Sequence, residues 1–252
     1  MTIKTGADLR LMDEAGRVVE DTLRLLRELA APGVTTEELD REAERYIRSR
    51  GAQPSFLHYH GYPKSTCTSV NEQLVHGIPG RYRLQDGDIL SVDVGAHLNG
   101  FHGDAARTYC IGSVPEEVRT LVRVTRECFY AGLRYARAGC RIGDISAAVQ
   151  AHAEAHGYGV VREMIGHGVG RNMHEPPDVP NYGAAGHGPR LLPGMTIAIE
   201  PMINLGTARI LQKPDGWTTV TADGRPSAHY ENTVAITEGE PLLLTLHGED
   251  VL

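Results

Sequence analysis

The stretch Asp86-Gly87-Asp88-Ile89-Leu90-Ser91-Val92-Asp93 has a counterpart in Pro193-Gly194-Met195-Thr196-Ile197-Ala198-Ile199-Glu200, and the glycine and the final carboxylate are both displaced by 107 positions (87 to 194 and 93 to 200). Upstream of each stretch, apolar residues at helical spacing lie between two glycines, which are displaced by 106 positions (33 to 139 and 51 to 157). Self-similarity at a fixed offset indicates a repeated structural unit. The sequence therefore predicts two similar halves.

The order of helical and strand patterns within each half determines the expected fold class. A longer and then a shorter segment show helical spacing, and strand-type alternation follows. Helices that precede strands in this way pack on one face of a sheet and leave the other face for a cavity. We expect an α+β fold with helices outside a curved, mostly antiparallel sheet, in a single domain over 1–252 with halves at about 8–110 and 115–237. The Gly- and Pro-rich stretch 176–194 is expected to be a long ordered loop.

Composition argues against several classes of protein. The chain has 252 residues, 41% hydrophobic and 23% charged, which is the balance of a globular protein with a substantial core. Its net charge of −7 argues against a protein that grips nucleic acid, because such proteins concentrate Lys and Arg. No apolar run approaches the ~18 residues of a membrane span, no apolar signal segment opens the chain, and the four isolated cysteines indicate reduced thiols. We therefore expect a cytoplasmic protein without a membrane partner.

Strand alternation predicts on which face of the sheet each carboxylate lies. In the segment 90–95 the bulky apolar residues share one face, and Asp93 shares the other with a serine and a glycine. The same division places Glu200 opposite two isoleucines, and Glu231 opposite Val234 and Ile236. Each acid is therefore expected on a face lined by small residues, away from the core.

A tight turn fixes how the first two acids face each other. Asn99-Gly100 suits a two-residue type I′ hairpin turn, because both residues tolerate positive φ angles. Residues paired across this turn have numbers that add up to 199, so Asp104 stands opposite Gly95 and diagonal to Asp93. Diagonal neighbours on one face lie ~7–8 Å apart at the backbone, close enough for two carboxylates to share an ion.

The predicted cavity face carries four carboxylates: Asp93, Asp104, Glu200 and Glu231. Gathered together they would raise one another's pKa values unless cations compensate them. Two divalent ions balance four negative charges, and mixed carboxylate and imidazole ligation suits Mn, Fe, Co or Zn better than calcium. The glycine-rich segment 166–174 supplies the imidazoles through His167 and His174. We therefore predict two divalent metal ions bound between the halves.

These segments resemble the type I methionine aminopeptidases, metallopeptidases of the pita-bread fold, over essentially the whole chain. The combination is highly specific, whereas Gly-His-Gly alone is a weak signal. The segments that carry the resemblance are Tyr59-His60-Gly61-Tyr62-Pro63-Lys64-Ser65, Val70-Asn71-Glu72, His76-Gly77-Ile78-Pro79, Asp93, Gly100-Phe101-His102-Gly103-Asp104, Gly166-His167-Gly168-Val169-Gly170, His174-Glu175, Ile199-Glu200-Pro201-Met202 and Tyr230-Glu231-Asn232-Thr233.

The resemblance implies a dinuclear metal centre in which Asp104 and Glu231 bridge both ions. The implied metal ligands are Asp93, Asp104, His167, Glu200 and Glu231. Two further histidines, His76 and His174, would contact the substrate amide and stabilise the tetrahedral intermediate. Glu200 is the candidate that handles the proton of the attacking water.

The resemblance also implies a pocket for the methionine side chain. The matching residues are Phe56, Tyr59, Tyr62, Cys67, Met173 and Trp217. Family members commonly carry a small residue such as Cys where Phe56 stands and an aromatic residue where Met173 stands. These two departures leave the shape of the pocket open.

The implied activity is removal of the N-terminal methionine from newly synthesised polypeptides whose second residue is small, by hydrolysis assisted by Co, Mn, Fe or Zn. The partners would be nascent N-termini, with the ribosome as a candidate meeting place; the chain would be a monomer and would need no nucleic acid. One alternative is a prolidase or Xaa-Pro aminopeptidase of the same fold, which usually carries a further N-terminal domain. Another is a non-catalytic peptide-binding homologue, which typically lacks metal ligands.

Overall fold

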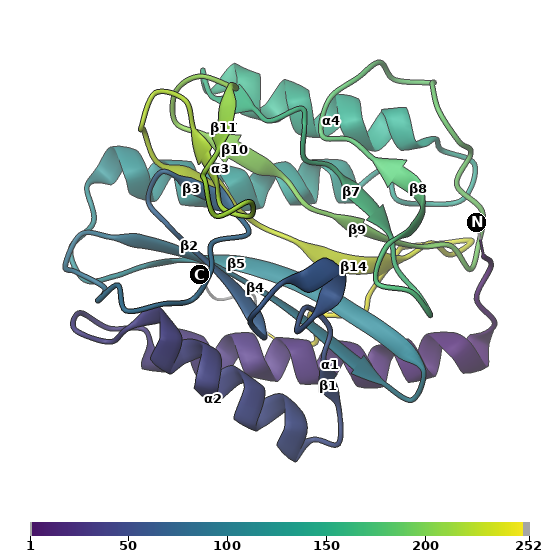
Figure 1. Ribbon diagram of the computed structural model, residues 1–252. Coiled ribbons are helices and arrows are strands. Elements are labelled where there is room, and N and C mark those ends of the chain that lie inside the picture. The colour runs from purple at the N-terminus through teal and green to yellow at the C-terminus, as the bar shows by residue number, and fades with distance from the viewer. Residues whose placement is uncertain (1, 249–252) are drawn as a thin grey trace.

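Helices cover both outer sides of a central sheet layer in the computed structural model, which describes residues 2–248 (Figure 1). The first half contributes α1 (Gly6–Leu29) and α2 (Thr36–Ser49), and the second contributes α3 (Glu116–Leu133) and α4 (Ile142–Ala155). Each half thus pairs a longer helix with one of 14 residues, as the internal repeat predicts. The ends of the predicted domain, residue 1 and residues 249–252, lie outside the described residues.

Local sequence explains where the first two helices begin. Thr5 and Asp8 form a reciprocal capping box at the start of α1, and Thr35 and Glu38 form another at the start of α2. Each cap satisfies backbone N–H groups that the first helical turn leaves unpaired, which contributes on the order of 1 kcal/mol. The helix starts are therefore encoded locally. None of the helices in the described part of the chain is long and apolar enough to cross a membrane.

The hairpin of β4 (Ile89–Leu98) and β5 (Phe101–Cys110) is the longest strand pairing and confirms the predicted register. Asn99 and Gly100 have φ angles of 51° and 83°, as a type I′ turn requires. Asp104 pairs with Gly95, so it lies diagonal to Asp93 on the same face.

The remaining strands form antiparallel ladders on either side of this hairpin, and every strand pairing within residues 2–248 is antiparallel. One sheet has the order β1-β4-β2 with β5 also paired to β4; the others have the orders β15-β14-β9-β7-β8, β13-β10-β6 and β11-β12-β3. Their bounds are β1 (Gln53–Pro54), β2 (Thr66–Val70), β3 (Gln73–Val75), β6 (Gly159–Val160), β7 (Gly166–Gly168), β8 (Glu175–Val179), β9 (Thr196–Ile199), β10 (Met202–Asn204), β11 (Ile210–Gln212), β12 (Thr219–Thr221), β13 (Ser227–His229), β14 (Asn232–Ala235) and β15 (Leu242–Leu243).

Ala106 and Glu231 join the two halves. Each donates its backbone N–H to the other's carbonyl, with N···O distances of 3.3 and 3.0 Å, so β5 is hydrogen-bonded to the residue that directly precedes β14. The buried Arg107 guanidinium strengthens the junction by donating to the carbonyl of Glu231 and to the side chain of Asn232. The expected curved sheet thus consists of several antiparallel ladders, and the junction between the halves includes one of the predicted metal ligands, Glu231.

Each half has its own apolar core, and the two cores lie on the helix-covered sides of the sheets. Leu90, Val92 and Val94 belong to the core under α1 and α2, and Ile197 and Ile199 belong to the core under α3 and α4. Fully burying one such side chain contributes about 1.5–3 kcal/mol. Because strand neighbours alternate between faces, these residues direct the intervening and following carboxylates to the opposite side.

The expectation of a loop throughout 176–194 is wrong at its first residues. Glu175–Val179 form β8, which pairs with β7 at the edge of the five-stranded sheet. Pro176 and Pro177 lack an N–H to donate, and proline is tolerated in an edge strand, where one side of the backbone needs no partner. The proline content that indicated a loop is compatible with this edge position.

Candidate metal centre and substrate cavity

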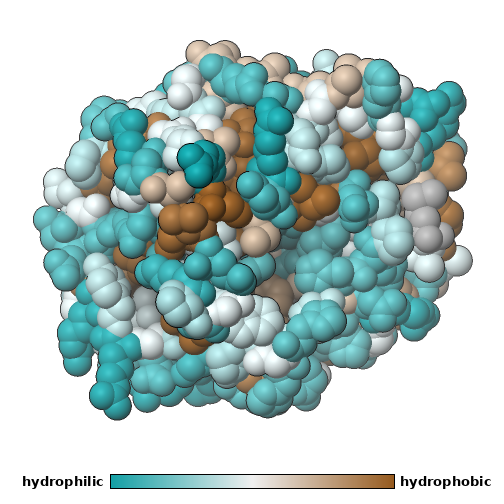
Figure 2. Space-filling view, turned by 45° about the horizontal axis from the view of Figure 1, so that its top comes forward, coloured by the Kyte–Doolittle hydropathy of each residue, from teal (hydrophilic) through white to brown (hydrophobic). Residues whose placement is uncertain are grey.

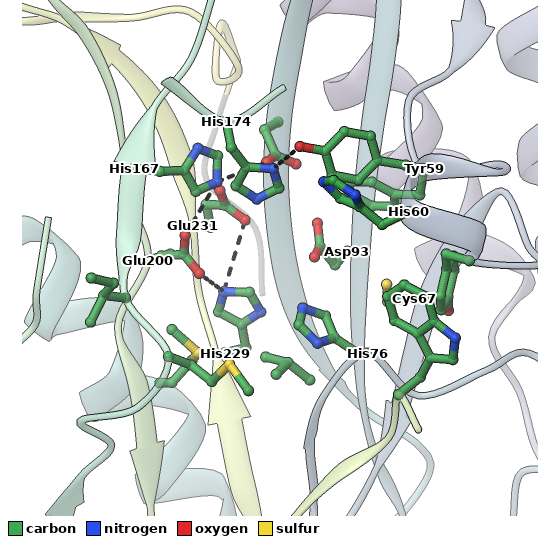
Figure 3. A pocket seen from close by; sticks show the side chains of 18 of the residues that line it. Tyr59, His60, Cys67, His76, Asp93, His167, His174, Glu200, His229 and Glu231 are labelled. Carbon is green, nitrogen blue, oxygen red and sulfur yellow. Dashed lines mark hydrogen bonds and ion pairs between the residues drawn. The ribbon is translucent and has the colours of Figure 1, made fainter. Parts of the chain in front are cut away.

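A cavity of about 340 Å³ opens between the two halves and contains the predicted ligands. On the face seen in Figure 2, apolar side chains gather around a hollow near its centre. The cavity is lined by both acidic and apolar residues, and Figure 3 shows His167, Glu200 and Glu231 on one side with Asp93 between them and Tyr59. A polar centre thus adjoins an apolar pocket.

All five residues expected to bind metal reach this cavity from five separate segments. Asp93 lies on β4, Asp104 on β5 and His167 on β7, whereas Glu200 directly follows β9 and Glu231 directly precedes β14. Four of them are at most 9% exposed, and Asp93 is half-buried. The convergence of residues 138 positions apart (93 to 231) depends on the junction between β5 and β14.

Distances within the cluster suit ligands that share an ion. His167 Nε2 lies 3.6 Å from Asp104 Oδ2 and 3.5 Å from Glu200 Oε1, too far for strong hydrogen bonds. The other ring nitrogen, Nδ1, is 2.8 Å from the Gly168 carbonyl and donates to it, which leaves the lone pair of a neutral ring on Nε2. Ligand atoms of Asp104, His167 and Glu231 all lie within 4.8 Å of one another. Such a set of two carboxylates and one imidazole fits a first-row divalent metal.

Several carboxylate oxygens of the cluster are buried and have no hydrogen-bond partner among residues 2–248. They are Asp93 Oδ1, Asp104 Oδ1 and Glu231 Oε1. An unpaired buried polar atom costs about 1–3 kcal/mol, and a charged one more. A cation-binding site requires oxygens that are free to bind the cation, and these oxygens have no donor among the described residues. The residues therefore fit bound metal ions.

The electrostatics of the cluster support the same interpretation. Burial raises the pKa of Asp93 and of Glu231 well above the usual range, and neighbouring carboxylates raise both further. Burial also raises the pKa of Asp104, although His167 opposes that shift. Burial alone would lower the pKa of His167, but Asp104 and Glu200 raise it to about 9. The protein thus concentrates negative charge in a low-dielectric site, which cations would stabilise.

His76 and His174 also line the cavity, as expected, but their pKa values are shifted in the other direction. Burial lowers the pKa of His76, and burial together with His167 lowers the pKa of His174 to about 4. Both rings are therefore neutral at pH 7. The Tyr59 hydroxyl lies 2.8 Å from His174 Nδ1 and can donate to it, which places the ring proton on Nε2. A neutral histidine held in this way can donate one hydrogen bond into the cavity.

An apolar pocket adjoins the polar cluster. Of the residues expected there, five line the cavity: Phe56, Tyr59, Tyr62, Cys67 and Trp217. The Tyr62 and Trp217 rings meet edge to face, with centroids 5.1 Å apart, and the Tyr62 hydroxyl donates to two backbone carbonyls at 3.0 Å. These contacts fix the shape of the pocket wall.

Met173 is not among the cavity-lining residues of the described chain. It is 1% exposed and packs with Phe56, Tyr62 and Cys67. Gly95 makes room for the two unusual side chains, because a Cβ there would lie 2.9 Å from a Phe56 ring carbon and 3.1 Å from the Met173 methyl. The bulky Phe56 and the flexible Met173 thus fill one volume together, with Phe56 forming the wall.

A model of metallopeptidase family M24 matches residues 10–238. The chain belongs to that family. Within it the chain belongs to the type I methionine aminopeptidases, because it is 52% identical to the methionine aminopeptidase of Clostridium perfringens, over 97% of this chain and 98% of that one. Methionine aminopeptidase 1 of Bacillus subtilis is 51% identical, over 93% and 95% of the two chains.

Solved structures agree with this assignment and confirm the pita-bread fold. The crystal structure of the Thermotoga maritima methionine aminopeptidase superposes with a TM-score of 0.96 at 43% identity, and covers 98% of this chain and 100% of that one. The prolidase of Pyrococcus furiosus has a TM-score of 0.78 at 23% identity, over 98% of this chain and 66% of that one. The prolidase likeness shows a shared fold alone.

Several residues that line the cavity were not predicted from the sequence. The unexpected lining residues are His60, Val75, Glu163, Met164, Ile165, Met202 and His229. Of these, His229 had a readable signal, because it precedes Glu231 by two positions and strand neighbours two apart share a face. The segment 163–165 follows β6 and precedes β7 in an irregular stretch, where no periodicity predicts which side chains turn inward.

Proposed function

We propose that this protein removes the N-terminal methionine from polypeptides whose second residue is small, by hydrolysis at a centre of two divalent ions, and that 2–248 and the flanking residues form one catalytic domain. The observation that carries the proposal is the convergence of four carboxylates and one histidine on a single cavity, with carboxylate oxygens that lack protein donors within residues 2–248. The membership in M24 and the identity to methionine aminopeptidases support it.

The proposed ligands are Asp93, Asp104, His167, Glu200 and Glu231, with Asp104 and Glu231 shared between the ions. Bound Mn, Fe, Co or Zn would polarise the scissile carbonyl and lower the pKa of a water molecule toward neutrality. Glu200 borders the cavity and is the group that takes up the proton of the attacking water. The α-amino group of the substrate, in its neutral form, would bind to those ions, which would restrict cleavage to the first peptide bond.

His76 and His174 are the proposed hydrogen-bond donors to the reacting peptide group. Both are neutral at pH 7, and Tyr59 holds the ring of His174 with its proton on Nε2. Donors that are already in place when charge develops on the scissile carbonyl oxygen stabilise the transition state without reorganisation. Their loss should therefore lower kcat more than it raises KM.

The apolar part of the cavity is the proposed methionine pocket. Its wall consists of Phe56, Tyr59, Tyr62, Cys67 and Trp217, and Met173 supports Phe56 from behind. An unbranched, polarisable methionine side chain packs well on the faces and edges of aromatic rings. We expect crowding at the position of the second residue to admit only a small side chain there.

The test is a series of peptide assays on chelated protein reloaded with each of the four metals. Met-Ala-Ser should be hydrolysed to free methionine, and peptides of the form Xaa-Pro should not. Preference for Xaa-Pro peptides would instead favour the prolidase alternative, whose fold this chain shares. If Met-Ala-Ser is not hydrolysed and elemental analysis finds no metal uptake, the result would favour a peptide-binding homologue and refute the proposal.

Asp104→Ala gives the matched variant for this assay. The substitution removes a carboxylate proposed to be shared between both ions, so metal uptake and turnover should be lost together, and full activity would refute the site. Glu28→Gln in α1 is the control, because Glu28 is exposed and does not line the cavity.

The setting of the reaction is proposed from the same resemblance. Nascent polypeptides carry the N-terminal methionine, so we expect the protein to act on them in the cytoplasm, at the ribosome among other places, as a monomer. Size-exclusion chromatography with light scattering tests the monomer, and sedimentation of purified ribosomes with the protein tests the association.

A further inference from the structure

His229 is a buried imidazole next to the metal centre that the five expected ligands leave without a role. It is the last residue of β13 and is 2% exposed. Figure 3 shows its ring beside Glu200, with one nitrogen directed at the carboxylates of Glu200 and Glu231 and the opposite edge of the ring facing His76. The ring thus points into the polar centre rather than into the core.

The Nε2 atom of His229 has no hydrogen-bond partner within residues 2–248. It lies 3.6 Å from Glu200 Oε2 and 3.8 Å from Glu231 Oε2, slightly beyond hydrogen-bond distance of both. A buried N–H that stays unpaired is destabilising by about 1–3 kcal/mol. A small rotation of either carboxylate would bring an acceptor within reach of this nitrogen.

The two oxygens of Glu200 face two different imidazoles. Oε1 lies 3.5 Å from His167 Nε2, and Oε2 lies 3.6 Å from His229 Nε2. If Oε1 and His167 are ligands of the same ion, Oε2 is the outward oxygen of that carboxylate. Metal-bound carboxylates are themselves held by hydrogen bonds from a second layer of residues, which fix their orientation. Glu231 fits this partnership less well, because a bridging carboxylate uses both oxygens.

We propose that His229 is a positioning residue that donates a hydrogen bond from Nε2 to Oε2 of Glu200. This inference rests on the proposed metal centre and goes beyond its five ligands. The hydrogen bond holds Oε1 toward His167 and the ion, and keeps Glu200 oriented to take up the proton of the attacking water. A competing arrangement has His229 bind an ion directly, since atoms of Asp93, His229 and Glu231 also lie within 4.8 Å of one another.

The test compares His229→Leu with His229→Gln, because a glutamine amide can donate at a similar reach and leucine cannot. Cobalt binding to the chelated protein is followed by calorimetry and by the visible absorption of Co²⁺, and kcat and KM are measured on Met-Ala-Ser. His229→Leu should weaken cobalt binding about 10–100-fold and change the spectrum, as loss of a second-layer partner does. His229→Gln should bind cobalt with an affinity within about threefold of the wild type and keep the wild-type spectrum. In His229→Leu, kcat should fall and KM should stay unchanged.

His102 provides the matched control, because it is a partly buried histidine outside the cavity lining that pairs with Ser55. His102→Leu and His102→Gln should leave the cobalt spectrum unchanged. If His229→Leu fails to fold by circular dichroism, His229→Asn takes its place, since its shorter amide cannot reach Glu200, and it should show the same loss.

Two results would overturn the inference. A cobalt spectrum changed as much in His229→Gln as in His229→Leu would make the imidazole a direct ligand, and wild-type binding in His229→Leu would leave it without a role. Either can occur while the wild-type protein binds metal and cleaves Met-Ala-Ser, so the proposed function would stand. If the wild-type protein itself binds no divalent ion, the proposed function and this inference both fail.

Discussion

Replacing Glu231 with Gln should have opposite effects on the stability of the chelated and the metal-loaded protein. The side chain of Glu231 is 1% exposed, its Oε1 lacks a hydrogen-bond partner among the described residues, and three other carboxylates lie around it. Glutamine has nearly the same shape but no charge. Without metal the variant should therefore be the more stable protein, and with metal it should be the less stable one.

The expected magnitudes follow from burial and mass action. Removing an uncompensated buried charged atom should relieve about 1–3 kcal/mol, and since 1 kcal/mol shifts Tm by about 2–4 °C in a chain of this size, the chelated variant should melt about 2–12 °C higher. An ion at 100 times its Kd stabilises the wild-type protein by about 2.7 kcal/mol, which raises its Tm by about 5–11 °C. The variant should gain little of that stabilisation, because Glu231 belongs to both groups of potential metal ligands in the cavity, Asp93/His229/Glu231 and Asp104/His167/Glu231.

Scanning calorimetry at pH 7 and pH 5, with chelator and with Mn²⁺, measures both effects. Burial raises the folded-state pKa of Glu231 above its ordinary value of 4.5, so the favourable contribution of the protonated carboxyl is complete below pH 4.5 and is lost as pH rises through the folded-state pKa. The difference in Tm between chelated variant and wild type should therefore be large at pH 7 and smaller at pH 5. The control Glu28→Gln should melt like the wild type. A chelated Glu231→Gln that melts below the wild type at pH 7, or an equal gain from metal in both, would refute the reasoning.

Three further predictions test other parts of the structure. Tyr59→Phe removes the hydroxyl that faces His174 Nδ1, and kcat on Met-Ala-Ser should fall by up to about tenfold with KM nearly unchanged, since such a hydrogen bond contributes about 0.5–1.5 kcal/mol; an unchanged kcat would exclude that role. Leu90→Ala in the core under α1 and α2 should lower the free energy of unfolding by about 2–5 kcal/mol in urea titrations, and a loss under 1 kcal/mol would contradict the packing. Glu175→Gln removes the partner of Lys4, whose ammonium helps hold the pKa of Glu175 at about 2 against the opposing effect of burial. The stability that Glu175 confers should be present above pH 4.5 and lost as pH falls toward 2, so the wild-type advantage in Tm should shrink over that range; an advantage that is constant with pH would argue against the ion pair.

Local rules sufficed for the helices, the central hairpin and the faces of its side chains. Thr5 and Thr35 start helices through contacts within three residues, and Asn99-Gly100 fixes the register of β4 and β5 because few residue pairs tolerate two positive φ angles. Once that register is set, the two-residue period of a strand places Asp93 and Asp104 on one face. Each of these features depends on neighbours that are close in the chain.

Side-chain positions in irregular segments were harder to anticipate. Met173 packs against Phe56 instead of lining the cavity. The space that both side chains occupy exists because Gly95, on a strand distant from Met173 in the chain, has no side chain. Glu175–Val179 form an edge strand despite two prolines, because only the sheet order shows which strand lacks an outer neighbour. Neither outcome has a local pattern that encodes it.

The sequence by itself determined the repeat, the helix starts, the hairpin register and the identity of the residues that could bind metal. Only the tertiary structure decided that these residues meet, because the backbone pair of Ala106 and Glu231 joins strands that are far apart in the chain. The same packing turned His229 toward Glu200 and left buried oxygens without protein donors in the described part of the cavity. The two-residue period of a strand determines on which face of its sheet each side chain lies. The distances between side chains of different strands are set only when the two halves pack together.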